Sequence, residues 1–160
     1  PFYKSTQKVR NVPGVNSSYK KDVILQVGEY DVNLFRGEDV DYNWRAIKNG
    51  WDVLYSPEIK VIHVHRPTWR GLFYQHYMYG RAYFLVRDKW KDMYSIYPRN
   101  YLSLKSFLKI IYVLVCPILD ALKKSRRLPS FTRSIFAIPI IFLINYYWLK
   151  GVWDQKRMQN

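Results

Sequence analysis

The chain has 160 residues, 49% of them hydrophobic, which is enough for one domain with a buried core. Its formal net charge of +14 predicts an anionic partner: nucleic acid, anionic lipid or a phosphorylated substrate. The single cysteine, Cys116, excludes an internal disulfide and gives no sign of an oxidising compartment. Because residue 1 is Pro rather than Met, we expect the chain to be a piece of a longer protein.

The densest basic run favours lipid over nucleic acid. It comprises Lys123, Lys124, Arg126 and Arg127, and it lies between two apolar segments. Such a position suits lipid headgroups, whereas a nucleic-acid surface needs cations interleaved with aromatics on one exposed face. Aromatic residues form 18% of the chain, which fits carbohydrate contact or a membrane interface. We therefore expect membrane lipids among the partners, and no nucleic acid.

Residues 1–103 have a mixed composition and predict a folded first region. Within it, residues 11–18 contain Pro and Gly punctuation and predict a loop. Val23, Ile24 and Val27 are spaced as one face of a short helix over residues 19–27, and Gly28 would end it.

A clearer helix begins at Glu38. Val40, Trp44 and Ile47 recur at i, i+4 and i+7 as an apolar stripe, and Asn49-Gly50 would terminate the helix. After it, residues 51–55 and 60–65 predict two short strands, and residues 71–87 predict a helix. Gly80, in the middle of that helix, indicates a close backbone approach.

Residues 104–160 consist of apolar blocks separated by basic runs and predict a membrane-associated tail. Ten uncharged residues lie between Lys109 and Asp120, and 16 lie between Arg133 and Lys150, against the roughly 20 that a spanning helix needs. We expect two apolar helices joined by a basic linker at residues 123–133. They would span the bilayer, lie in its interface or form a hairpin that dips in; the alternative is two buried helices of a bundle.

The acidic run Gly37-Glu38-Asp39-Val40-Asp41 is the sharpest candidate for chemistry. Three carboxylates fall in four positions at a helix start, where the helix dipole favours negative charge. A carboxylate at the edge of a site can accept the proton of a sugar hydroxyl. The alternative is that these acids only cap the helix.

His63 and His65 are candidate metal ligands, because two histidines at i, i+2 share one face of a strand. The alternative is a core histidine hydrogen-bonded to backbone. In the following helix, Arg81 can pair with a pyrophosphate through its planar fork, whereas ordinary packing explains most of the neighbouring aromatic side chains.

Taken in order, these features resemble the C-terminal half of a family 2 glycosyltransferase catalytic domain of the GT-A type. The resemblance runs from Asn16 to Arg87, nearly half of the chain. The matching residues are Asn16-Ser17-Ser18-Tyr19-Lys20-Lys21, Val27-Gly28-Glu29-Tyr30-Asp31, Gly37-Glu38-Asp39-Val40-Asp41 with Arg45, Gly50, Pro57, His63, and Tyr79-Gly80-Arg81. It implies an α/β fold: a partial GT-A domain at 1–103, the acceptor-side half, followed by apolar membrane-associated helices at 104–160.

The resemblance also implies roles for single residues. Asp39 matches the family's catalytic base, and Glu38 would orient the acceptor. His63 matches a metal-ligand position, with His65 as the weaker candidate. Arg81 would face the donor phosphates. Three further candidates are structural or line the acceptor and donor sites: Asn16, Gly37 and Asp41.

The implied reaction is an inverting transfer from a nucleotide-sugar donor to an acceptor hydroxyl, in the synthesis of a cell-surface polysaccharide or glycolipid. The acceptor would be a glycan or a lipid-linked sugar, and the catalytic region would lie on the cytoplasmic side. The family's Asp-X-Asp metal motif does not occur where it should, since Asp39-Val40-Asp41 belongs to the acceptor loop. The Mg or Mn ion would therefore need ligands from a missing N-terminal half, and the 160 residues alone would be inactive.

Three other functions are alternatives. A processive polysaccharide synthase would carry Gln-X-X-Arg-Trp after the acidic loop, and Gln75 does not begin that pattern. A non-enzymatic, membrane-anchored basic interaction module would explain the charge and the aromatics but not the ordered motifs. Nucleic-acid binding is disfavoured by the position of the charges.

Overall fold

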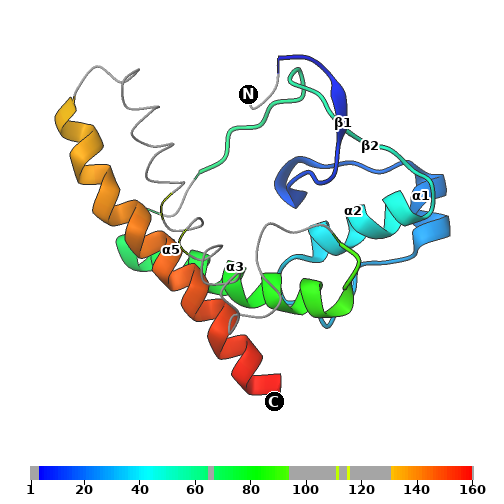
Figure 1. Ribbon diagram of the computed structural model, residues 1–160. Coiled ribbons are helices and arrows are strands. Elements are labelled where there is room, and N and C mark those ends of the chain that lie inside the picture. The colour runs from blue at the N-terminus through cyan, green and yellow to red at the C-terminus, as the bar shows by residue number, and fades with distance from the viewer. Residues whose placement is uncertain (1–3, 65–66, 94–110, 112–114, 116–130, 160) are drawn as a thin grey trace. The chain divides into compact units, whose positions relative to one another are not determined.

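The computed structural model describes residues 4–64, 67–93, 111, 115 and 131–159 (Figure 1). In chain order the elements are β1 (Gln7–Val9), the short 3-10 helix η1 (Gly14–Asn16), α1 (Lys21–Val27), α2 (Glu38–Lys48), β2 (Val53–Tyr55), α3 (Trp69–Lys89) and α5 (Phe131–Gln159). They divide into two compact units. The first unit comprises residues 1–66 and 82–91, and the second comprises residues 67–81 and 92–160. The end of α3 therefore belongs to the first unit, and its beginning to the second.

The two short helices of the first unit end on glycines, which confirms the helices predicted from residue 19 and from Glu38. Gly28 adopts a φ of 81° after α1, and its N–H donates to the carbonyl of Ile24 at 3.0 Å. Asn49 caps α2, and Gly50 follows with a φ of 85°. Positive φ costs glycine little, so the sequence sets both ends locally.

The buried face of α2 differs from the apolar stripe that marked this helix in the sequence. Val40, Trp44 and Ile47 are only half-buried. The buried residues of α2 are Asp41, Tyr42, Asn43 and Ala46. Tyr42 and Ala46 form the core of the first unit with Val23 of α1. The helix turns a partly polar face inward because that face finds specific partners, which are described below.

β1 and β2 form a two-stranded antiparallel sheet, with Gln7 opposite Tyr55 and Val9 opposite Val53. The strand predicted within residues 51–55 is confirmed, whereas β1 was not predicted. The strand predicted at residues 60–65 is wrong where the structure describes it, because residues 60–64 are irregular. Ile62 is 98% exposed, and no described strand pairs with this segment. Without a ladder partner, an alternating sequence does not form a strand.

In the second unit, α3 and α5 touch backbone to backbone at two glycines. A Cβ on Gly80 would stand 1.9 Å from the carbonyl oxygen of Trp148, and one on Gly151 would stand 2.0 Å from that of Tyr77. The close approach predicted at Gly80 is thus confirmed. Polar contacts flank the crossing, since Tyr77 donates to Asp154 at 3.2 Å. The helix predicted at residues 71–87 is confirmed as α3.

The predicted fold class, an α/β partial GT-A domain followed by apolar membrane-associated helices, is wrong. The described residues are mostly helical, and their sheet consists of two three-residue antiparallel strands. The segment expected to extend the sheet, residues 60–64, pairs with nothing described and leaves Val64 87% exposed. Local alternation in the sequence was therefore not matched by the long-range pairing that a larger sheet requires.

The predicted membrane location, with the catalytic region on the cytoplasmic side, is also corrected. Among the residues that the structure describes, no helix combines the length and the apolar character needed to cross a bilayer. In α5 the apolar run is interrupted by Asn145, Lys150 and Asp154. The first predicted apolar segment (residues 110–119) and most of the basic linker at 123–133 lie outside the described residues.

Candidate active site

Asp39 and Glu38 occupy the first turn of α2, directly after a glycine in a left-handed conformation. Gly37 has a φ of 79° and forms the N-cap without any side-chain capping bond. A Cβ at this position would stand 3.0 Å from Val86 in the last turns of α3. Gly37 therefore serves both the turn and the packing. The two acids follow the N-cap residue, and Asp39 uses one carboxylate oxygen to accept an N–H of the first turn.

The carboxylate of Asp39 links α2 to the loop before α1. Its Oδ2 accepts the backbone N–H of Gly14 at 2.9 Å, and its Oδ1 accepts that of Val40 at 2.8 Å. The Cβ of Asp39 would stand 3.3 Å from a Cβ on Gly14, so glycine lets the loop come close. Two fixed N–H donors hold the carboxylate in one orientation, and each oxygen keeps a lone pair for a further proton.

Glu38 is half-buried next to Asp39, and its Oε2 is enclosed. Within the part of the chain that the structure describes, this oxygen has no hydrogen-bond partner. An enclosed carboxylate oxygen without a donor is costly unless a ligand or water supplies one. Glu38 therefore has an unused acceptor one residue from Asp39.

An open groove of about 1540 Å³ lies in the first unit. It is lined by most of residues 6–20 and 50–61, together with Val23, Asn43 and Ala46. Asn16 belongs to this lining, and its amide donates to the carbonyl of Ile59 at 3.3 Å. Asp39 and Glu38 do not line the groove. Asp39 instead contacts Gly14. The chain neighbours of Gly14, Pro13 and Val15, line the groove, so the Asp39 carboxylate lies behind the loop that forms part of the groove wall.

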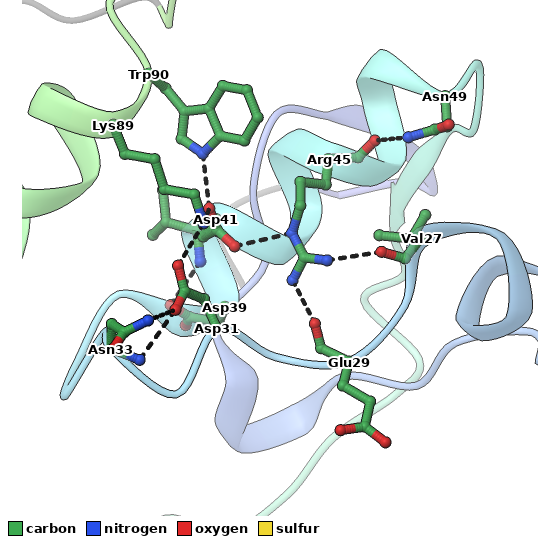
Figure 2. A network of polar contacts seen from close by, with 11 residues as sticks. Val27, Glu29, Asp31, Asn33, Asp39, Asp41, Arg45, Asn49, Lys89 and Trp90 are labelled. Carbon is green, nitrogen blue, oxygen red and sulfur yellow. Dashed lines mark hydrogen bonds and ion pairs between the residues drawn. The ribbon is translucent and has the colours of Figure 1, made fainter.

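Asp41, the third acid of the run, is fully buried at the centre of a charge network (Figure 2). Its Oδ2 lies 2.9 Å from Nε of Arg45, and its Oδ1 lies 2.8 Å from Nζ of Lys89. The indole N–H of Trp90 donates to the same Oδ1 at 2.6 Å. A buried carboxylate needs such partners, and here they come from one turn further along α2 and from the end of α3.

The network extends to the segment between α1 and α2. The guanidinium of Arg45 donates to the carbonyls of Val27 and Glu29 at 2.7 Å each, and Lys89 also pairs with Asp31 at 2.6 Å. The Lys89 hydrogen bond, with help from Asn33, lowers the pKa of Asp31 to about 2. Two cations and two carboxylates thus fix the segment that leads into Gly37, which positions the first turn of α2.

Arg81 lies in the second unit and contacts α5. Its Nε donates to Gln155 at 2.8 Å, and its Nη2 lies 3.6 Å from the sulfur of Met158. Gln155 is buried. These contacts hold the guanidinium against α5, and its predicted role toward the donor phosphates stays a prediction.

His63 lies in the exposed irregular segment after β2, and His65 lies outside the described residues. No group of three His, Cys, Asp or Glu residues suited to a metal ion occurs among the described residues. The described residues therefore do not form a complete metal site by themselves.

Two residues of the Asp41 network, Lys89 and Trp90, were not predicted from the sequence, and Asp31 was matched to the family without a role. Lys89 and Trp90 lie 48 and 49 positions from Asp41, and nothing in a local pattern connects them. The available signal was the composition of α2, where a charged residue stands among apolar ones and needs a partner if it is buried.

Comparisons with known proteins connect the chain to glycosyl transfer over part of its length. Over 72 residues, 45% of this chain, it is 35% identical to a protein named pre-mycofactocin glycosyltransferase in each of two strains of Mycobacterium tuberculosis. The matched stretch spans 15% of the length of each relative. No family model and no solved structure matches the chain. The chain is therefore similar, in this stretch, to a glycosyltransferase.

Proposed function

We propose that the protein is a family 2 glycosyltransferase that moves a sugar from a nucleotide-sugar donor to an acceptor hydroxyl with inversion of configuration. The geometry of Asp39 is the observation that carries this proposal. Its carboxylate is fixed by two backbone donors in the first turn of α2, directly behind the loop that lines the groove. The partial identity to proteins named as glycosyltransferases supports the same reaction class.

In the proposed reaction Asp39 is the general base. It takes the proton of the acceptor hydroxyl while the hydroxyl oxygen forms a bond to the anomeric carbon of the donor. The bond between that carbon and the nucleotide diphosphate breaks, and the diphosphate leaves with the bonding electrons. Because attack and departure occur on opposite faces, the configuration inverts. Base catalysis of this kind contributes about 10²–10⁴-fold to a rate.

The two neighbouring acids, Glu38 and Asp41, would have different roles. Glu38, with its unpaired Oε2, would accept a second hydroxyl of the acceptor and orient it. Asp41 has no exposed surface and would act as a positioning residue through Arg45 and Lys89. Asn16 would contact the acceptor from the groove wall.

A divalent metal remains part of the proposal, with His63 as the ligand that the described residues would contribute. Its other ligands would have to lie beyond the described residues, since these contain no complete group. The proposed product belongs to cell-surface polysaccharide or glycolipid synthesis, an assignment supported only by the resemblance in the sequence.

The test is an Asp39→Asn substitution in the protein as it is naturally expressed. The assay supplies UDP- and GDP-hexoses with a set of glycan acceptors and measures the release of nucleoside diphosphate. We expect the substitution to lower kcat by about 10²–10⁴-fold, because the amide cannot take the proton.

Asp22→Asn is the matched control, since Asp22 also lies in the first turn of a helix but is exposed. This control should keep wild-type turnover, and both variants should unfold at similar urea concentrations. Near-native turnover by the Asp39→Asn variant would remove Asp39 from the mechanism. A non-enzymatic interaction module would show no donor turnover in any variant.

A further inference from the structure

The groove of the first unit carries an excess of positive charge. Among the described residues that line it, four side chains are cationic and one is anionic: Lys8, Arg10, Lys20 and Lys60 against Asp52. Asp52 is paired with Lys8 at 2.8 Å. Lys20 and Lys60 are exposed, and no described carboxylate lies within ion-pair distance of either. The groove therefore has cationic groups that its own carboxylates do not neutralise.

The two lysines belong to two parts of the groove wall. The Asn16 amide donates to the carbonyl of Ile59, which ties the loop before α1 to the segment after β2. Lys60 follows Ile59, and Lys20 lies four residues beyond Asn16 at the N-cap of α1. Asn16, Ser17 and Ser18 add amide and hydroxyl groups to the same lining.

The size of the groove argues for an extended ligand. Its volume of about 1540 Å³ is above the roughly 300–1,000 Å³ of ordinary small-molecule sites. Aromatic faces, on which sugar rings can stack, are present in the lining at Tyr19, Trp51 and Tyr55. Polar groups, aromatic faces and unpaired cations together fit a sugar chain that bears negative charge.

We propose that this groove binds an acceptor glycan carrying a phosphate group, with Lys20 and Lys60 as the phosphate contacts. The inference rests on the proposed glycosyl transfer and names the substrate class for it. Asp39 does not line the groove, but its carboxylate accepts the N–H of Gly14, whose chain neighbours Pro13 and Val15 belong to the groove wall. The phosphate of a nucleotide donor has the same chemistry, so the experiment has to separate the two sources.

The experiment measures the binding of glucose 1-phosphate, methyl glucoside and UDP by calorimetry. It compares the wild-type protein with a Lys20→Gln/Lys60→Gln double variant at fixed low salt. We expect glucose 1-phosphate to bind about tenfold more weakly to the double variant, because two close Coulomb contacts are lost. Binding of the uncharged methyl glucoside should be unchanged.

The control is a Lys21→Gln/Lys91→Gln double variant, which loses the same net charge at exposed positions outside the groove. It should bind glucose 1-phosphate like the wild type. Equal weakening in both double variants, or no weakening in either, overturns the proposal. UDP binding that falls as much as glucose 1-phosphate binding would assign the groove to the donor and overturn the acceptor assignment.

The Asp39→Asn variant separates this proposal from the proposed function. It should lose sugar transfer and keep glucose 1-phosphate affinity. If phosphate binding depends on the two lysines but no sugar is transferred, the groove binds phosphate as proposed and the proposed glycosyl transfer is wrong. If sugar transfer depends on Asp39 but the KM for a phosphorylated acceptor is the same with and without Lys20 and Lys60, only the groove assignment is wrong.

Discussion

Asp41 and Arg45, one turn apart on α2, form an ion pair in which the carboxylate has no exposed surface and the guanidinium side chain is 17% exposed. The same guanidinium reaches the carbonyls of Val27 and Glu29. Arg45 therefore connects α2, which carries Asp39, to the end of α1 and the residues after it (Figure 2). The Asp39 carboxylate itself is held by the N–H groups of Gly14 and Val40.

Substitution Asp41→Asn is expected to destabilise the protein by about 3–5 kcal/mol, because it leaves two cations without their buried carboxylate. The measurement is the urea midpoint of unfolding, with Asp22→Asn as the exposed control. The control should change the midpoint little. A midpoint for Asp41→Asn equal to that of the control would show that the buried pairs contribute no stability.

The ion pair of Asp31 with Lys89 predicts that the stability of the protein falls at acidic pH. Its hydrogen bond from Lys89 lowers its pKa from 3.8 to about 2. A lowered pKa in the folded state gives stability that is present above pH 3.8 and is lost as the pH falls toward 2. The urea midpoint of the wild type should thus exceed that of Asp31→Asn at neutral pH, and the difference should shrink across this window. Asp88→Asn, at the exposed end of α3, should show no such narrowing.

Tyr19 donates a hydrogen bond to the buried side-chain amide of Asn43 in α2. Its hydroxyl donates to Oδ1 of Asn43 at 3.2 Å, and Asn43 is fully buried. Tyr19→Phe should destabilise the protein by about 1–3 kcal/mol, since the amide oxygen loses this donor. The check is thermal unfolding beside Tyr74→Phe, a control on an exposed face of α3.

Tyr19 also makes the stability of the folded protein depend on alkaline pH. Burial, as the largest cause, raises the pKa of Tyr19 from 10.0 to about 12. Since the folded state favours the neutral phenol, its contribution is complete below pH 10 and is lost as the pH rises to about 12. Between pH 10 and about 12 the free energy of unfolding should fall more for the wild-type protein than for the Tyr19→Phe variant. Parallel pH profiles of the two proteins would contradict this assignment.

The crossing of α3 and α5 should not accept a methyl group on either glycine. Gly80→Ala and Gly151→Ala each place a Cβ within about 2 Å of a backbone carbonyl, so the helices must separate. We expect each to cost about 1–3 kcal/mol, although alanine alone would favour a helix. The double variant should cost less than the sum of the two, because one separation relieves both clashes. Additive losses, or a gain in stability, would argue against a close crossing.

The sequence predicted most of the helices that the structure describes, because their signals are local. The glycines after α1 and α2, the apolar spacing from Val40 to Ile47 and the close approach at Gly80 could all be read from neighbouring residues. The helix ends and the apolar spacing depend on neighbouring residues, whereas Gly80 indicated a close approach without identifying its partner, Trp148 of α5.

The tertiary structure decided what these helices bury and which strands form. Residues 60–64 alternate as a strand does, but they have no described pairing partner and remain irregular. Asp41 lies in a sequence that resembles an acceptor loop, yet it is buried because Lys89 and Trp90, nearly 50 residues away, supply its counter-charge and donor. Hydrophobic periodicity reports only the intrinsic character of a segment. The partner of a buried charge or of a strand edge is set by chain segments that meet only when the protein has folded.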